Sequence, residues 1–175
     1  MLFFPQTIMT LPYHPLRDSN SAVTDPSWAG LIWSSIFKHY VPEHNLTINQ
    51  ALDIGTGYGH VVSVGHETFG VNVFGVDIRQ EIYQGPKDRF VKADLLKSWP
   101  FQDNSFDLVL EHLVFDDLVG LQKLPSEDVT QHFNSELNRV LRNGGTFFSH
   151  TSGFIPDSSF SLIASDRPFL LYQKE

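Results

Sequence analysis

A glycine-rich segment, Asp53-Ile54-Gly55-Thr56-Gly57-Tyr58-Gly59, follows a short apolar run and has the composition of a ligand-binding turn. Glycines let the backbone approach a ligand, and a helix that starts directly after the turn presents free N–H groups. The dinucleotide fingerprint Gly-x-Gly-x-x-Gly would place its third glycine at position 60, which is His60 here. Asp53 precedes the first glycine, and its carboxylate would repel a bound pyrophosphate. The segment therefore favours S-adenosylmethionine, which carries an ammonium and a sulfonium group and no phosphate, over NAD.

Two further aspartates stand at the ends of predicted strands. Asp77 lies at the end of the apolar run 71–78, about 20 residues after the glycine turn, where it can accept hydrogen bonds from both hydroxyls of a ribose. Asp94 follows the run 90–93 and can accept a hydrogen bond from an adenine amino group. The alternatives are a solvated strand-end aspartate for Asp77 and a turn cap for Asp94.

The first 48 residues are predicted to be an irregular arm, over 1–24, followed by a helix. Asp25 is the predicted N-cap, apolar side chains follow at helical spacing as far as Tyr40, and Pro42 is expected to end the helix. One interpretation is a helix packed on the domain. The other is a lid whose Trp28 and Trp33 help to enclose a ligand.

From about residue 50 the pattern alternates between strands and helices. Strands are predicted over 51–54, 71–78, 90–93, 106–110, 146–150, 160–164 and 169–173. Helices are predicted over 60–69 and from an N-cap at Ser126 to a close at Gly144-Gly145. This alternation predicts an α/β fold with a mostly parallel sheet, and the turn residues 165–168 predict that the last two strands pair antiparallel. The binding domain is expected to span 49–175.

Five motifs in this order resemble those of class I S-adenosylmethionine-dependent methyltransferases, and the small-molecule, UbiE-like branch is the most similar. They are residues 52–59, 74–77, 93–94, 99–109 and 137–145. The resemblance implies a Rossmann-like, doubly wound, seven-stranded sheet in which strand seven lies antiparallel between strands five and six. It also implies S-adenosyl-L-methionine as cofactor, bound by Asp53, Gly55, Thr56, Gly57, Gly59, Asp77, Ile78, Asp94, Leu95 and Glu111.

In this family the residues just after strand four face the transferred methyl group, and here they are Glu111 and His112. Methyl transfer is an in-line displacement, so the protein supplies alignment and, for an oxygen or nitrogen acceptor, a base. His112 is the first candidate base because histidine titrates near neutral pH; the alternative is a histidine that only shapes the pocket. His150 is a second candidate base, and Glu111 is a candidate contact for the donor's ammonium group.

The chain departs from the family pattern in two places, which predicts a shortened version of the fold. Only 16 residues separate Asp77 from Asp94, and Gly85-Pro86 interrupts them, so the helix expected there must be short or missing. The stretch between His150 and Phe160 is also too short for the usual last helix. The pair Tyr83-x-x-x-Lys87 matches a dehydrogenase spacing, but Gly85-Pro86 prevents the shared helix face that this chemistry needs.

The amino-acid composition limits the classes of molecule that the protein is expected to bind. The net charge is −8, Lys and Arg form no cluster, and the sequence contains no Cys. We therefore expect a small-molecule acceptor, with neither nucleic acid nor a membrane as partner, a cytoplasmic location and no metal site; the short domain is compatible with a homodimer. The predicted function is methyl transfer to oxygen or nitrogen. The alternatives are a protein that binds S-adenosylmethionine or S-adenosylhomocysteine without turnover, and an NAD-dependent enzyme.

Overall fold

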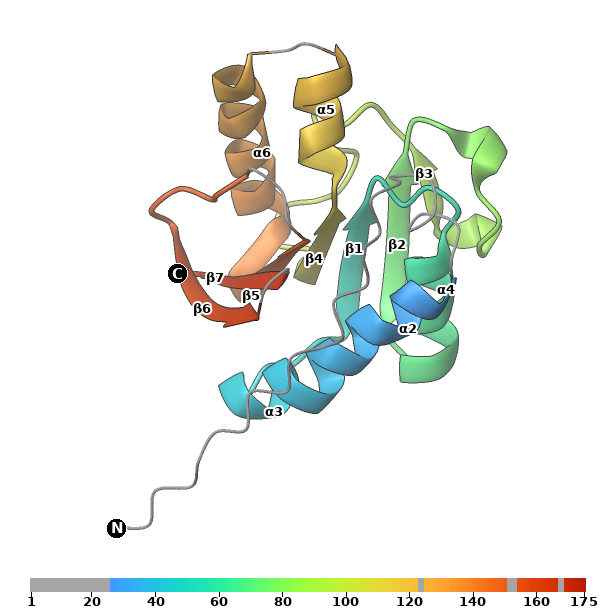
Figure 1. Cartoon of the computed structure of the whole chain (residues 1–175), viewed down its shortest axis with the longest axis vertical. Helices are drawn as coiled ribbons and strands as arrows, with labels where there is room; N and C mark the ends of the chain where they lie inside the picture. The colour runs from blue at the N-terminus through green and yellow to red at the C-terminus, as the bar shows by residue number, and fades with distance from the viewer. Residues whose placement is uncertain (1–25, 123–124, 151–153, 167–168) are drawn as a thin grey trace.

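The computed structural model describes residues 26–122, 125–150, 154–166 and 169–175, and a seven-stranded sheet forms its centre (Figure 1). The strands are β1 (Gln50–Ile54), β2 (Asn72–Asp77), β3 (Phe90–Lys92), β4 (Phe106–His112), β5 (Leu141–His150), β6 (Phe160–Asp166) and β7 (Phe169–Lys174). Their order is β3-β2-β1-β4-β5-β7-β6. Strands β1 to β5 are parallel, and β7 lies antiparallel between β5 and β6. The predicted fold class and the antiparallel C-terminal hairpin are confirmed.

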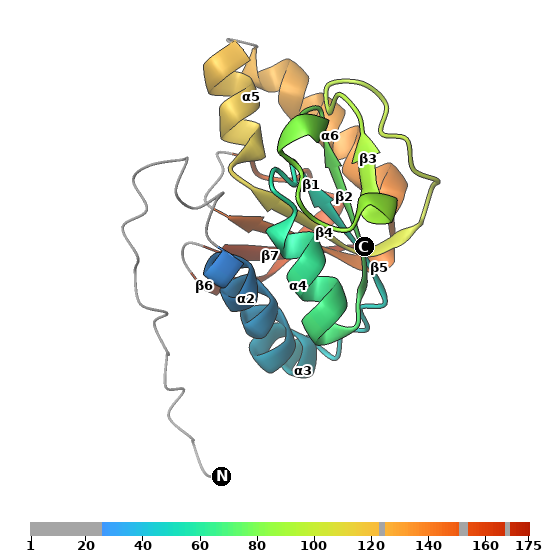
Figure 2. The ribbon, with the colours of Figure 1, turned by 90° about the vertical axis from the view of Figure 1, so that its right-hand side faces the viewer.

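Helices cover both faces of the sheet (Figures 1 and 2). They are α2 (Pro26–Ser35), η1 (Ile36–Tyr40), α3 (Val41–His44), α4 (His60–Phe69), η2 (Gln80–Ile82), η3 (Lys87–Arg89), α5 (Val114–Gln122) and α6 (Ser126–Val140). Helices α2 and α4 pack together beside β1 and β2, whereas α5 and α6 lie on the opposite face. No helix of these described segments is both long and apolar enough to cross a membrane.

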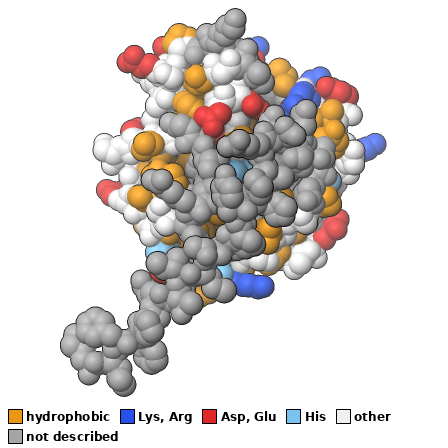
Figure 3. Space-filling model, viewed as in Figure 1, with side chains coloured by type: hydrophobic (Ala, Val, Ile, Leu, Met, Phe, Trp, Pro, Cys, Tyr) orange, Lys and Arg blue, Asp and Glu red, His pale blue; other side chains and the backbone are white. Residues whose placement is uncertain are grey.

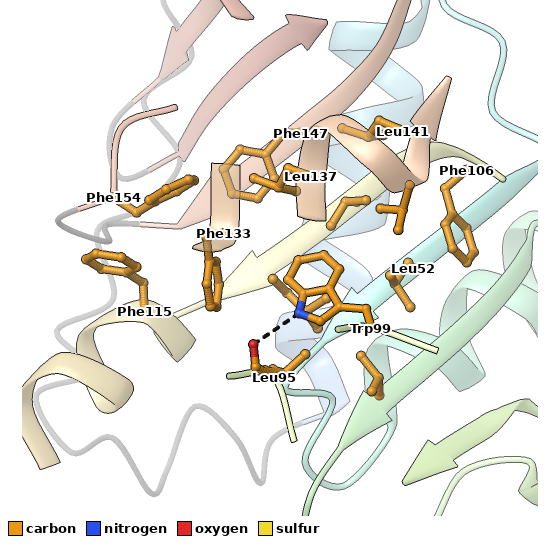
Figure 4. Close-up of a cluster of buried hydrophobic side chains, with 14 of the residues drawn as sticks. Leu52, Leu95, Trp99, Phe106, Phe115, Phe133, Leu137, Leu141, Phe147 and Phe154 are labelled. Carbon is orange, nitrogen blue, oxygen red and sulfur yellow. Dashed lines mark hydrogen bonds between the residues drawn. The ribbon is translucent and has the colours of Figure 1, made fainter. Parts of the chain in front are cut away.

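Each face of the sheet has its own apolar core. On the α6 side, Trp99 and Phe133 are fully buried, and their rings meet edge to face at 5.6 Å (Figure 4). The Trp99 indole N–H donates to the Leu95 carbonyl at 3.1 Å, so the buried polar atom is satisfied. On the α2 side, Trp33 is completely buried and donates to the Val61 carbonyl at 2.8 Å. Trp33 therefore belongs to the core, as the packed-helix interpretation expected.

The N-terminal helix continues past Pro42, so the prediction that this proline ends it is wrong. The π-helical turn η1 precedes α3, and the Val41 N–H donates to the Ile36 carbonyl five residues earlier. Pro42 then occupies the first turn of α3. An N–H in the first turn of a helix has no partner within that helix, so proline, which lacks this N–H, is tolerated there. The helix ends instead at Asn45, which has a left-handed φ of 51°. The predicted arm 1–24 and the N-cap Asp25 lie outside the described residues.

Helix α6 ends at Val140, and Leu141 passes directly into β5, which corrects the predicted close at Gly144-Gly145. The Arg142 side chain gives the physical reason. Its guanidinium donates to the Ser105 carbonyl at 3.1 Å and pairs with Asp107 at 2.7 Å, which holds the chain alongside β4. At the other end of α6, Pro125 takes the cap position that was predicted for Ser126.

The connection between Asp77 and Asp94 contains only the two short 3₁₀ turns η2 and η3, as its length and Gly85-Pro86 predicted. Tyr83 and Lys87 do not share a helix, and the Tyr83 hydroxyl donates to the Pro86 carbonyl. Residues 154–159 form no helix. Helix α5, directly after β4, was not predicted.

An ion pair within α6, between the buried Glu136 and the partly buried Arg139, ties the loop before β4 to this helix. Glu136 accepts from the Trp99 N–H at 2.6 Å and pairs with Arg139 at 2.6 Å, and Arg139 also donates to the Trp99 carbonyl at 2.8 Å. Replacing Arg139 with alanine is expected to lower the free energy of unfolding by ~2–4 kcal/mol, because the buried Glu136 carboxylate loses its countercharge. Urea unfolding measures this, with Arg142→Ala as the more exposed control; equal losses in the two variants would contradict the expectation.

Candidate active site

The glycine segment forms a tight bend between β1 and α4. Gly55, Gly57 and Gly59 have φ values of 68°, 51° and 81°, the left-handed region in which side chains are strained. The N–H groups of Gly55 and Thr56 both donate to the Val76 carbonyl, at 2.8 and 3.1 Å, which anchors the bend on β2. The bend therefore has its shape before any ligand binds, and its backbone is open to close approach.

Three buried carboxylates stand at the carboxyl ends of adjacent strands. Asp53 and Asp77 are each 3% exposed, and Glu111 is 1% exposed. The register pairs Ile54 with Val76 and with Glu111, so β1, β2 and β4 bring these groups to one edge of the sheet. Burial raises the pKa of Asp53 to about 7, and the charges of Asp77 and Glu111 add to the effect. This edge is thus strongly electronegative when all three groups are ionised.

Asp77 connects the bend with the segment after β2. Its carboxylate accepts from the Gly57 N–H at 3.0 Å and from the Arg79 N–H at 2.8 Å, and the Arg79 guanidinium pairs with it at 3.2 Å. Burial by itself would raise the pKa of Asp77, but these hydrogen bonds and the Arg79 charge outweigh it and lower the pKa. Asp77 is therefore ionised at neutral pH. Sequence reasoning missed Arg79, although a basic residue two positions after the aspartate was visible.

Glu111 holds the start of α5. One carboxylate oxygen accepts from the Phe115 N–H at 3.2 Å, and the other accepts from the Ser149 hydroxyl at 2.9 Å. Leu113, between the strand and the helix, has a left-handed φ of 61°. Because Val114 packs directly over Gly55, the Glu111 contact also determines how α5 covers the bend.

The residues predicted to contact adenine differ in their surroundings. Ile78 is 56% exposed, whereas Leu95 is buried. Asp94 accepts from the Leu96 N–H at 3.0 Å, the turn-capping geometry that the sequence left as the alternative, and pairs with Lys97 at 3.5 Å. The bend, Asp77 and Glu111 thus form one compact group, and Ile78 adjoins it from the exposed side.

Aromatic rings gather beside this group. His112 and His150 face each other across β4 and β5, with their rings stacked at 4.4 Å. Trp28, from α2, lies 5.5 Å from the His112 ring and 5.0 Å from the His150 ring, and Phe169 of β7 lies 5.0 Å from His150. Burial lowers the pKa of His112 to about 4, and burial together with His112 lowers the pKa of His150 to about 3. Both imidazoles are neutral at pH 7.

A cavity of about 590 Å³ opens on the other side of the bend, lined by Gln80, Glu81, Tyr83, Lys87, Phe90 and Lys92. Tyr83 separates it from the bend, since a Cβ on Gly59 would lie 2.3 Å from the Tyr83 ring. The sequence-predicted residues lie along the edge of the sheet and not in this cavity.

The family model described as a methyltransferase domain matches residues 52–149, which include the bend, the three carboxylates and His112. The chain belongs to the methyltransferase domain family. No curated protein matches its sequence.

Solved structures share the fold of this methyltransferase domain. An S-adenosylmethionine-dependent methyltransferase from Clostridium acetobutylicum ATCC 824 is 22% identical with a TM-score of 0.52, and the match covers 67% of this chain and 48% of that one. A protein from Methanococcus maripaludis is 17% identical with a TM-score of 0.56, over 86% and 93% of the two chains. One from Pyrococcus horikoshii OT3 is 16% identical with a TM-score of 0.59, over 93% and 97%. This chain spans about half the length of the Clostridium protein.

S-adenosylmethionine is the cofactor of the Clostridium protein. The site fits that molecule in charge, because the buried carboxylates Asp53 and Asp77 and the preformed bend would receive a positively charged amino-acid nucleoside. A pyrophosphate in the same place would be repelled by these carboxylates, of which only Asp77 has the Arg79 guanidinium beside it in the contacts described above.

Proposed function

We propose that this domain transfers a methyl group from S-adenosylmethionine to an oxygen or nitrogen atom of a small molecule by in-line displacement. The observation that carries the proposal is the bend of left-handed glycines beside the buried carboxylates Asp53, Asp77 and Glu111. On the face that Figure 3 shows, the visible Lys and Arg side chains are scattered, which supports a small-molecule acceptor over a polyanion. Membership of the UbiE-like branch stays a prediction.

The roles proposed for the cofactor-binding residues follow their positions. Gly55, Thr56, Gly57 and Gly59 would let the backbone approach the amino-acid part, and Asp53 would compensate its ammonium charge. Asp77 would bind the ribose hydroxyls, and Ile78, Asp94 and Leu95 would border the adenine. When bound, the cofactor supplies a methyl group on a sulfonium: the acceptor–carbon bond forms, and the carbon–sulfur bond breaks with its electron pair returning to sulfur.

His112 is the proposed contact for the acceptor. It lies one residue beyond Glu111, which the register pairs with Ile54, the residue before Gly55. Its lowered pKa keeps the ring neutral at pH 7, the form required either of a base or of a neutral hydrogen-bond donor. We propose that the imidazole ring of His150 also contacts the acceptor.

Replacing Asp77 with asparagine is expected to weaken cofactor binding about 10- to 100-fold, because charge-assisted hydrogen bonds to the ribose would be lost. Calorimetry with S-adenosylhomocysteine measures the affinity. Asp94→Asn, in which the turn contact can be kept, is the matched control with a smaller expected loss. Unchanged affinity in Asp77→Asn would remove the ribose assignment.

The proposed function itself is tested in two steps. Calorimetry with S-adenosylmethionine, S-adenosylhomocysteine and NAD should detect the first two ligands; binding of NAD alone would overturn the proposal. Transfer of a radiolabelled methyl group to a panel of carboxylates, phenols and amines should then identify a turned-over acceptor. Cofactor binding without transfer to any acceptor would identify a binding protein without turnover.

A further inference from the structure

Trp28 reaches from α2 to the two histidines at the carboxyl edge of the sheet. Its indole N–H donates to Nδ1 of His112 at 3.4 Å, a contact between residues 84 positions apart. Its ring also lies 5.0 Å from His150 and 5.6 Å from Phe169. Trp28 is only partly buried, whereas Trp33 of the same helix is completely buried, so the apolar core depends less on Trp28 than on Trp33.

The indole contact has a consequence for the proton on His112. A neutral imidazole has one N–H and one lone-pair nitrogen, and the nitrogen that accepts a hydrogen bond is the one without the proton. Since Nδ1 accepts from Trp28, the proton lies on Nε2. Within the described part of the chain, Nε2 is buried and has no hydrogen-bond partner. A buried donor without a partner costs free energy, so a hydrogen bond from this N–H to an acceptor atom of a ligand would be favourable.

We infer that Trp28 is a positioning residue, which orients the neutral His112 ring so that its Nε2–H donates a hydrogen bond to the methyl acceptor. This inference rests on the proposed function and deepens it. A ring held in this tautomer has no lone pair on Nε2, so it does not take a proton from the acceptor.

The substrate class follows from the proton balance. A phenol or an ammonium must lose a proton when its new bond to carbon forms, whereas a carboxylate oxygen is already ionised at neutral pH and loses none. The partly exposed rings of Trp28 and His150 beside His112 suit a flat apolar body. The acceptor class is therefore an aromatic carboxylate, with one oxygen receiving the methyl group and the other accepting from Nε2–H.

The tautomer is tested by nitrogen NMR of the full-length protein, without cofactor or acceptor, at pH 7. The expected spectrum of His112 has a protonated Nε2 and an unprotonated Nδ1. In Trp28→Phe, which keeps a ring and removes the indole N–H, the ratio of the Nδ1-protonated to the Nε2-protonated ring should rise about fivefold. Trp33→Phe is the control, because it removes an indole hydrogen bond of the same helix that does not involve His112. A protonated Nδ1 in the wild type, or equal ratios in the two variants, would overturn the inference.

The role of the N–H is tested by substitution. His112→Gln keeps a neutral donor that cannot act as a base, and it should retain turnover within about tenfold of wild type, whereas His112→Ala should lose about 100-fold. Equal losses in the two variants would favour a base and overturn the donor role. With S-adenosylhomocysteine bound, benzoate should shift the His112 Nε2–H signal and aniline should not; no shift with benzoate would remove the carboxylate assignment. Because the tautomer is read in the free protein, its failure is separate from a failure to bind cofactor or to transfer methyl groups.

Discussion

Asp53→Asn is expected to stabilise the free protein at pH 8 and to weaken binding of S-adenosylmethionine by about 10- to 100-fold. The two effects have one cause. Asp53 is buried beside Asp77 and Glu111, which raises its pKa to about 7 and makes its ionised form unfavourable until a positive ligand arrives. Asparagine removes the charge, and with it both the penalty in the free protein and the attraction for the ligand.

The pH dependence of the free energy of unfolding shows whether ionisation of Asp53 stabilises or destabilises the fold. Between pH 4 and pH 7 the folded protein keeps the Asp53 proton, whereas the unfolded chain, at the ordinary pKa of 3.8, has lost it. The unfolded state binds fewer protons, so the free energy of unfolding falls as pH rises through this window and levels off above pH 7. Asp53→Asn should lack this fall and gain on the order of 2–4 kcal/mol at pH 8 relative to wild type. Thermal melts from pH 4 to pH 8 measure it, with the exposed Asp88→Asn as control.

The same titration governs cofactor affinity. Below pH 7 the wild-type Asp53 is protonated in the free protein, so affinity for S-adenosylmethionine should fall by up to about tenfold for each pH unit below 7. In Asp53→Asn the affinity should be weaker and nearly independent of pH between 5.5 and 7. A variant that binds as tightly as wild type, or that is less stable at pH 8, would contradict the assignment of Asp53.

Gly55→Ala is expected to lower the free energy of unfolding by more than about 3 kcal/mol and to abolish detectable cofactor binding. The added Cβ would lie 2.2 Å from Cγ2 of Val114, and the φ of 68° is itself unfavourable for alanine. Val114 begins α5, whose start is held by Glu111, so relief of the clash would displace the covering of the bend. Unfolding in urea and calorimetry with S-adenosylhomocysteine measure the two losses.

Gly70→Ala separates the effect of the contact with Val114 from the effect of the positive φ. Gly70 has the same φ of 68°, but an added Cβ would meet nothing within 4 Å. It should therefore cost only about 1–2 kcal/mol and leave cofactor affinity unchanged. A Gly55→Ala variant that is no worse than Gly70→Ala would show that the contact with Val114 is unimportant.

Most of the sheet was predictable because strand and helix periods are local properties of the chain. The apolar runs around Leu52 and Val109 have the composition of strands buried on both faces, and β1 and β4 contain them. The connection after Asp77 was predicted to lack a full helix from its length and Gly85-Pro86 alone. Helix α5 escaped prediction because its two aspartates, Asp116 and Asp117, obscure the apolar side that faces the sheet.

The tertiary contacts overruled local preference at two boundaries. Pro42 stops a helix when its N–H is needed, but here the π turn shifts the hydrogen-bond register at Val41, and Pro42 lies in the first turn of α3. Gly144 favours a helix end, yet Arg142 binds Ser105 and Asp107 and holds the chain as a strand beside β4. Neither the register shift nor the partners of Arg142 can be read from neighbouring residues.

By itself, the sequence determined the parallel sheet and the chemistry at its carboxyl edge. Glycines at 55, 57 and 59 require an unusual backbone, and parallel strands necessarily bring the carboxylates at their ends to the same side. Only the tertiary structure decided which groups are partnered: Glu111 with the start of α5, and Trp28 with His112. The physical reason is separation along the chain. The periodicity of apolar residues indicates the local conformation of the backbone, over a few residues of the chain. The position of one proton on His112 depends instead on the Trp28 side chain, which packing brings from helix α2.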